Sequence, residues 1–152
     1  MPEGPEVKRN AVQLSDAITG SKILTAEVNS GRYTKKPMDG LQGFLNNLPS
    51  RVLSVNCRGK FIYLKFDCGI NLWSTLGMTG IWSKRNTKHT RFTLQKKDGN
   101  SVFFNDIRNF GTLKFVHGQE KLAEKLLTLG PDMLSENVSD EIFLEKLRKV
   151  NR

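Results

Sequence analysis

Cysteine and histidine, the residues that build disulfides and most metal sites, are scarce in this sequence. Its 152 residues include two cysteines, Cys57 and Cys68, and two histidines, His89 and His117. The cysteines form no Cys-x-x-Cys motif and the histidines lack the spacing of metal ligands. Both facts argue against a disulfide framework and against a zinc site within this chain. We expect the two cysteines to be small core or near-core residues.

The sequence also lacks long apolar runs. No stretch approaches the roughly 18 apolar residues that a membrane-spanning helix needs. The first six residues contain neither the basic nor the apolar segment of a signal peptide. Apolar residues still make up 38% of the chain, which suits a globular domain with its own core. We therefore expect an intracellular protein with no membrane partner.

Acidic residues are outnumbered by basic ones. The chain has 24 lysines and arginines against 15 aspartates and glutamates, which gives a net charge of +9. Such an excess favours a polyanionic partner, with nucleic acid as the first candidate and an anionic membrane surface as the second. A basic protein without a polyanionic partner is the remaining alternative.

What is present is a mainly β pattern with helices at both ends. Val7, Ala11, Leu14 and Ile18 recur at helical spacing and predict a helix that begins at Pro5. Strand-like runs separated by turn signals follow at residues 22–28, 52–55, 61–66, 70–74, 91–95, 101–104 and 112–116. At least six short strands at this spacing favour a sandwich or barrel over a sheet of βαβ units.

The remaining segments are expected to be loops and helices. Residues 32–37 predict a basic, turn-rich loop, and residues 40–48 predict a short helix. Residues 120–129 predict a second amphipathic helix. Its apolar face is expected to hold three leucines: Leu122, Leu126 and Leu129.

The first residues have the composition of a reactive site. Once the initiator methionine is removed, Pro2 presents a secondary amine, and an α-amino group has a pKa of about 8, so part of it is neutral at pH 7. Such an amine can attack a sugar C1′ and form an iminium, and Glu3 and Glu6 are candidate general acids. The alternatives are structural. In the structural alternative, Pro2 has no role beyond being near the start of the chain. The acidic residues, Glu6 above all, would stabilise a helix N-terminus through the helix dipole.

Five segments in order resemble the formamidopyrimidine-DNA glycosylase / endonuclease VIII family, over essentially the whole chain. Members of this family excise oxidised bases from DNA and cut its backbone. The matching segments are residues 1–7 (MPEGPEV), 58–60 (RGK, the catalytic lysine turn), 76–80 (LGMTG, the intercalation loop), 106–111 (DIRNFG) and 129–132 (LGPD, the exit from the first domain). The resemblance implies a two-sheet β-sandwich preceded by an N-terminal helix.

By this resemblance, the catalytic roles of the family fall on residues near the N-terminus and in the RGK turn. Pro2 is similar to the nucleophile that displaces the base and forms the iminium. Glu3 resembles the acid that opens or protonates the sugar, and Glu6 is a further catalytic candidate. Lys60 resembles the lysine that contacts phosphate beside the lesion, whereas its plain alternative is an exposed lysine in a turn.

Met78, Arg108 and Phe110 resemble the residues that fill the gap left by a flipped nucleotide. Apolar wedges replace part of the lost stacking, and the arginine donates to the orphaned base. Core packing is the alternative for Met78 and Phe110, although their glycine-rich and polar neighbours favour loops. Further candidates for DNA contacts are basic residues near these motifs: Arg58, Lys88 and His89, with Arg32, Lys35 and Lys36 as weaker ones. These basic residues fit a solvated face equally well.

The sequence departs from the family pattern in the DIRNFG segment, where Ile107 replaces a proline and Asn109 an arginine. Residues 58–60 are similar to the endonuclease VIII branch, whereas residues 76–78 and 108–110 are similar to the formamidopyrimidine branch. The preference between oxidised purines and oxidised pyrimidines is therefore left open.

The expected organisation is a catalytic β-sandwich domain over residues 1–133 and the first helix of a helix–two-turn–helix domain over residues 134–152. Family members continue beyond this point, so we expect this chain to be the N-terminal part of a longer enzyme. The chemistry needs no cofactor in this chain, and a zinc finger would belong to the missing C-terminal part.

The predicted function is that of a bifunctional DNA glycosylase and AP lyase of base excision repair. We expect a monomer that acts on damaged double-stranded genomic DNA, with single-stranded DNA as an alternative substrate. The rival is a non-catalytic module that binds damaged DNA. Pro2 and Glu3 discriminate between the two, because binding alone needs no nucleophilic amine.

Overall fold

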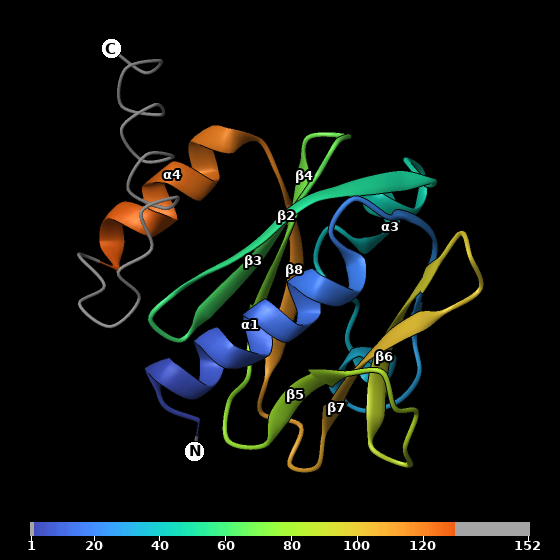
Figure 1. Cartoon of the computed structure of the whole chain (residues 1–152), viewed down its shortest axis with the longest axis vertical. Helices are drawn as coiled ribbons and strands as arrows, with labels where there is room; N and C mark the ends of the chain where they lie inside the picture. The colour runs from blue at the N-terminus through green and yellow to red at the C-terminus, as the bar shows by residue number, and fades with distance from the viewer. Residues whose placement is uncertain (1, 130–152) are drawn as a thin grey trace.

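The computed structural model describes residues 2–129 (Figure 1), so the segment 134–152 and its predicted helix lie outside the described residues. A long N-terminal helix, α1 (Gly4–Ile18), packs against a sheet. The described part of the chain contains these strands: β1 (Lys22–Val28), β2 (Ser50–Arg58), β3 (Phe61–Phe66), β4 (Ile70–Thr75), β5 (Gly80–Ser83), β6 (Thr90–Lys96), β7 (Ser101–Asp106) and β8 (Thr112–His117). The other helices in this part are α2 (Arg32–Lys35), α3 (Leu41–Leu45) and α4 (Gln119–Thr128).

The strands form one antiparallel sheet in the order β5-β7-β6-β1-β2-β3-β4-β8. Its two four-stranded halves are joined by a short pairing of Lys22 and Ile23 with β2. The halves face each other. Trp82 of β5 donates its indole N–H to Ser74 of β4 over 3.1 Å. The predicted mainly β fold with an N-terminal helix is confirmed, and its two layers are the halves of one folded sheet.

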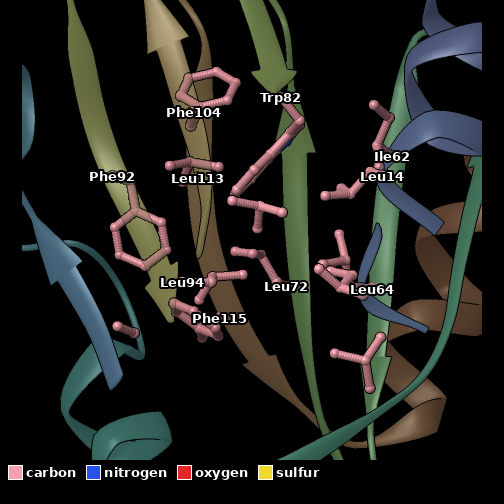
Figure 2. Packing of buried hydrophobic residues seen from close by; sticks show 14 of the residues in the cluster. Leu14, Ile62, Leu64, Leu72, Trp82, Phe92, Leu94, Phe104, Leu113 and Phe115 are labelled. Carbon is pink, nitrogen blue, oxygen red and sulfur yellow. The ribbon is translucent and has the colours of Figure 1, made fainter. Parts of the chain in front are cut away.

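The hydrophobic core lies between these two layers. Phe92 of β6 and Phe115 of β8, which belong to opposite halves of the sheet, have ring centroids 6.1 Å apart. Figure 2 shows their side chains pointing into the same interior as Leu64, Leu72 and Leu14, the last of which comes from α1. Each fully buried side chain of this size contributes about 1.5–3 kcal/mol to folding. The core therefore fixes the ends of the strands, where the loops begin.

Helix α1 is held to the sheet by the apolar stripe that the sequence predicts. Val7, Ala11, Leu14 and Ile18 are each at most 4% exposed. Pro5 lies in the first turn, where its missing N–H and fixed φ do no harm. The buried stripe thereby holds the residues just before the helix, including Pro2, against the body of the protein.

A buried polar residue attaches α1 to the edge of the sheet. The side chain of Asn10, 4% exposed, donates to the Trp82 carbonyl over 2.8 Å and accepts from the Trp82 N–H over 2.9 Å. Strand β5 is an edge strand, and an edge leaves backbone groups that need partners. Asn10 supplies these partners and fixes α1 relative to β5.

Three expectations are corrected. Residues 32–35 form the helical turn α2 and not a loop. Its N-cap Gly31 has a φ of 87°, a conformation that glycine adopts without strain and that starts the turn. Leu129 does not share the buried face of α4, because the helix ends at Thr128 and Leu129 is 39% exposed. Residues 80–83 form strand β5, which the sequence did not predict because it is a four-residue edge strand with little alternation to detect.

Within residues 2–129, no helix combines the length and the apolar character that a membrane crossing requires.

Candidate nucleic-acid interface

The start of α1 and the β2–β3 turn meet at one end of the molecule (Figure 1). Lys60 Nζ lies 3.5 Å from Glu3 Oε2, although the two residues are 57 positions apart. Gly59, with a φ of 59°, allows β2 to turn into β3 within two residues and so places Lys60 at the tip. The fold thus brings together two of the catalytic candidates.

The ion pair is accessible to a substrate. The side chains of Lys60 and Glu3 are 47% and 66% exposed. Glu3 is the N-cap of α1, yet its side chain makes no capping hydrogen bond, so its carboxylate is directed to Lys60. An exposed pair of this kind contributes little to stability. A carboxylate and an ammonium held together at the surface can instead exchange a proton with a ligand and bind its phosphate.

Pro2 and Glu6 lie close to this pair in the chain. Pro2 is half-buried and immediately precedes Glu3, whereas Glu6 is exposed in the first turn of α1. The position of Glu6 fits the dipole explanation, because negative charge stabilises the start of a helix. The structure therefore joins Glu3, the residue after Pro2, to Lys60 by an ion pair, whereas Glu6 has the position expected from the helix dipole.

The three candidate wedge residues lie on two neighbouring loops. Met78, between β4 and β5, is 43% exposed, and Phe110, between β7 and β8, is 56% exposed, so neither residue packs in the core. Arg108 on the second loop is also exposed. The loops touch at Gly77, where an added Cβ would come within 2.7 Å of the Phe110 carbonyl carbon. Both loops lie at the end of the molecule where the described chain begins (Figure 1).

Ile107 and Arg91 belong to this region, although no role was predicted for either. Ile107, at the position of the family's proline, is 63% exposed beside Arg108 and adds to the apolar tip of the second loop. Arg91 fixes the start of that loop, because it donates to the Asp106 carbonyl over 2.8 Å and to the Ile107 carbonyl over 3.2 Å. An arginine at the start of a predicted strand carries no such signal, since its partners are distant in sequence.

The predicted phosphate contacts differ in accessibility. Lys88 is exposed and His89 is half-buried in the loop before β6. The His89 carbonyl accepts the Asp106 N–H over 3.0 Å, which attaches this loop to the base of the β7–β8 loop. Arg58 is only 7% exposed at the end of β2, so little of it is accessible to a ligand.

A basic groove of about 350 Å³ begins beside the β7–β8 loop. Arg32 of α2 lines it and donates to the Gly111 carbonyl over 3.4 Å. Lys114 of β8 lies 4.9 Å from the ring centre of Trp73 and lines the same groove. The other basic residues along it are Lys36 and Lys125. Cations next to aromatic rings suit the backbone and bases of nucleic acid.

Among the described residues, no group of three or more histidine, cysteine, aspartate or glutamate side chains could hold a metal ion. Cys57 is a buried free thiol of β2, as expected for a core residue, and Cys68 is half-buried in the β3–β4 turn. The arrangement therefore supplies an acid, a cation and apolar wedges from the protein's own side chains.

Comparison with known proteins connects these features. The family described as Formamidopyrimidine-DNA glycosylase N-terminal domain matches residues 1–113. The formamidopyrimidine-DNA glycosylase of Cytobacillus firmus is 30% identical over 158 residues, which cover 100% of this chain and 57% of the relative. That of Thermus thermophilus is 32% identical over 154 residues, which cover 100% of this chain and 54% of the relative. The chain thus spans about half the length of the curated relatives it matches.

Solved structures agree with this match. The MutM (Fpg) protein from Thermus thermophilus superposes with a TM-score of 0.72 at 31% identity, over 89% of this chain and 48% of that protein. MutM in complex with DNA containing carbocyclic 8-oxo-G also has a TM-score of 0.72, but at 23% identity it supports the fold alone. The family match covers 113 of the 152 residues. The chain therefore belongs to the formamidopyrimidine-DNA glycosylase family and contains that family's N-terminal domain.

Proposed function

We propose that this chain is the catalytic part of a DNA glycosylase and AP lyase that removes oxidised bases in base excision repair. The observation that carries the proposal is the contact between Glu3 and Lys60, beside Pro2 and at the same end of the molecule as the exposed wedge loops. Family membership and the net charge of +9 support the same assignment.

The first step is base displacement. With Met1 removed, the neutral amine of Pro2 attacks C1′ of the damaged nucleoside. The bond between C1′ and the base breaks, and the base leaves with the electron pair and takes up a proton. The amine then passes its own proton to the Glu3 carboxylate. The position of Pro2 before α1 favours the neutral amine, because the positive end of the helix dipole disfavours an ammonium there.

The second step opens the sugar. Glu3 donates a proton to O4′ as the bond between C1′ and O4′ breaks, which leaves an iminium between C1′ and the Pro2 nitrogen. The iminium withdraws electrons and acidifies the C2′ proton. Loss of that proton expels the 3′ phosphate, and a second elimination expels the 5′ phosphate. Water then hydrolyses the iminium and returns the free amine.

Lys60 and the wedge loops hold the substrate for these steps. We assign the Lys60 ammonium to the phosphate beside the lesion, within reach of Glu3. Met78, Arg108 and Phe110 fill the space of the extruded nucleotide, and Lys88 and His89 are assigned to flanking phosphates. We leave Arg58 out of direct contact because it is buried, and we keep Glu6 as a secondary acid that is exposed in the first turn.

Damaged duplex DNA is the proposed partner. Relatives of similar fold have been solved with DNA that contains 8-oxo-G or a Fapy-dG derivative. Because the proposed substrate is genomic DNA, we place the protein inside the cell. We also propose that it acts as a monomer. Single-stranded DNA is a second proposed substrate, because the basic groove with its aromatic ring does not require a paired strand. The proposed division into domains at residue 133 leaves the second half of the DNA cleft to a following helical domain.

Borohydride trapping tests the proposal on the protein at its full natural length. The protein is mixed with a duplex that carries an abasic site or an oxidised base, and the mixture is reduced. We expect a covalent adduct on the N-terminal tryptic peptide, residues 2–8. A variant that retains Met1 is the control, because its proline nitrogen is an amide and should give no adduct.

The rival function is a non-catalytic module that binds damaged DNA. The wedge loops and the basic groove suit it equally well, whereas a nucleophilic amine next to Glu3 and Lys60 is unnecessary for it. A protein that binds the abasic duplex in a gel-shift assay, yet gives no adduct with or without Met1, would establish the rival in place of the enzyme.

A further inference from the structure

A buried carboxylate lies between the two wedge loops. Asp106, at the end of β7, is 0% exposed. Its Oδ1 accepts the hydroxyl proton of Thr79 over 2.5 Å, and its Oδ2 accepts the backbone N–H of Gly111 over 2.8 Å. Thr79 ends the β4–β5 loop and Gly111 ends the β7–β8 loop, so one side chain ties both loops together.

The hydrogen bonds form a chain with a defined direction. The backbone N–H of Arg108 donates to Thr79 Oγ1 over 2.8 Å. The Thr79 hydroxyl in turn donates its proton to Asp106. The hydroxyl thus accepts from one loop while it donates to the buried carboxylate. Valine has the shape of threonine but can do neither, whereas serine can do both.

Two further features restrict the conformation of the second loop. Arg91 donates to the carbonyls of Asp106 and Ile107 and also to Ser30 Oγ over 3.1 Å. Asn109 has a φ of 59°, in the left-handed region that asparagine tolerates better than most residues. The tip that carries Arg108 and Phe110 is therefore fixed at its base, while its side chains stay exposed.

We propose that Asp106, acting through Thr79, is a positioning residue that holds Met78 at a set distance from Arg108 and Phe110, so that the two loops enter the duplex together and extrude the damaged nucleotide. This inference rests on the proposed function, because it assumes that the loops act on DNA. None of the hydrogen bonds described above involves Pro2, Glu3 or Lys60. Asp106 is therefore expected to affect base extrusion and not the iminium chemistry.

Thr79→Val is the test variant and Thr79→Ser is the conservative variant that should restore function. Thr25→Val is the matched control. Thr25 lies on β1, and its exposed hydroxyl donates to Gln95 over 3.2 Å. Asp106→Asn is a second variant. Its side-chain NH₂ would face either the Thr79 hydroxyl or the Gly111 N–H, both of which donate to the carboxylate of the unaltered protein. Urea denaturation of each variant shows whether it is folded.

The variants are compared on two substrates that differ in the cost of extrusion. One is a duplex with an oxidised base. The other is an abasic site in a single strand, where there is no base to extrude and no pair to break. A misplacement of about an ångström is enough to cost up to about 100-fold in rate. We expect Thr79→Val to slow excision from the duplex by about 10- to 100-fold. Trapping at the single-stranded abasic site should stay within about twofold, and Thr79→Ser should stay close to the unaltered protein.

A second readout needs no chemistry. The fluorescence of 2-aminopurine placed opposite the lesion rises when the duplex unstacks, and we expect Thr79→Val to lower that rise. Equal losses on both substrates, or no loss of either excision or fluorescence in a folded Thr79→Val protein, would overturn the inference. If the unaltered protein gives no adduct at all, the proposed function fails. The fluorescence of the variants then still decides whether Asp106 and Thr79 position the loops.

Discussion

The N-terminal site and the pair of wedge loops lie at the same end of the protein but are held in opposite ways. Glu3 and Lys60 are 66% and 47% exposed and are joined by an ion pair of 3.5 Å. The loops converge on Asp106, which is fully buried and bonded at both oxygens. A group that reacts must be reachable, whereas a group that positions others works best where water cannot compete. Activity and stability should therefore respond differently in the two regions.

The largest expected effect is a loss of activity at the N-terminal site without a loss of stability. Glu3→Gln removes the proposed acid and should lower the rate of iminium formation by about 10²- to 10⁴-fold. The free energy of unfolding should change by no more than about 0.5 kcal/mol, because the side chain is exposed. A time course of borohydride trapping measures the rate of iminium formation, and urea denaturation measures the free energy of unfolding.

Glu120→Gln is the matched control, an exposed glutamate in the first turn of α4. It should leave both quantities unchanged. A Glu3→Gln protein that traps DNA at the normal rate would show that the carboxylate takes no part in the chemistry.

The next effect links the two regions through α1. Asn10→Ala removes both hydrogen bonds to the Trp82 backbone and leaves two buried groups without partners, at about 1–3 kcal/mol each. We expect a loss of about 2–6 kcal/mol in the free energy of unfolding. Activity should fall as well, because Pro2 and Glu3 directly precede α1 and depend on its placement.

Gln13→Ala, an exposed change on the same helix, should alter the free energy of unfolding by no more than about 0.5 kcal/mol. Equal stability of the two variants in urea would mean that the apolar stripe alone fixes the helix.

A smaller effect is expected where the two loops touch. Gly77→Ala places a Cβ within 2.7 Å of the Phe110 backbone, at a φ of 58°. Strain and overpacking together should cost about 2–4 kcal/mol if the loops cannot move, and less if they separate. Separation would appear as slower excision from duplex DNA.

Gly59→Ala isolates the backbone strain, since Gly59 has a φ of 59° and nothing within 4 Å of its added Cβ. It should cost only about 1–2 kcal/mol. If Gly77→Ala were no more costly than Gly59→Ala and left excision unaltered, the contact between the loops would be unimportant.

The smallest expected effect is on stability, at Asp67, a carboxylate that lies outside both regions. Hydrogen bonds from the Ser50 hydroxyl and the Arg51 amide hold the pKa of Asp67 below its usual value. A lowered carboxyl pKa stabilises the folded state at pH values above the ordinary carboxyl pKa, and this contribution is lost as the pH falls through the lowered pKa. Ser50→Ala should therefore cost about 1 kcal/mol at pH 7 and less in acid.

Urea denaturation across this acid range, with Asp67→Asn as the control, measures the effect. The Asp67→Asn background should abolish the pH dependence of the Ser50→Ala difference. A larger loss is expected for Thr79→Val than for Ser50→Ala, because Thr79→Val removes two hydrogen bonds and Ser50→Ala removes one. A Ser50→Ala difference that grew in acid would contradict the assigned direction of the pKa.

Much of the fold could be predicted because its signals are local. The stripe of Val7, Ala11, Leu14 and Ile18 specified α1, and β1 and β3 were predicted with the bounds that the structure has. Strand β5 and the turn α2 were not predicted, because one is a short edge strand and the other a single turn. Such elements depend on distant partners, such as Asn10 for β5.

The candidate site divides in the same way. The motifs placed Met78 and Phe110 in loops, and the structure confirms that both are exposed. The sequence did not indicate that Arg58 is buried while its neighbour Lys60 is exposed, because the tight turn reverses the chain between them. It also assigned no role to Asp106 or Thr79, whose partners come from separate loops.

The sequence by itself determined the alternation of the strands, the buried face of α1, the excess of positive charge and the order of the motifs, because each depends on residues that are close along the chain. Only the tertiary structure decided that Glu3 meets Lys60 and that Asp106 is buried between two loops. These contacts join residues up to 57 positions apart, and they exist because the halves of the sheet and α1 pack on one core. Packing geometry thus decides which of the motif residues can act together.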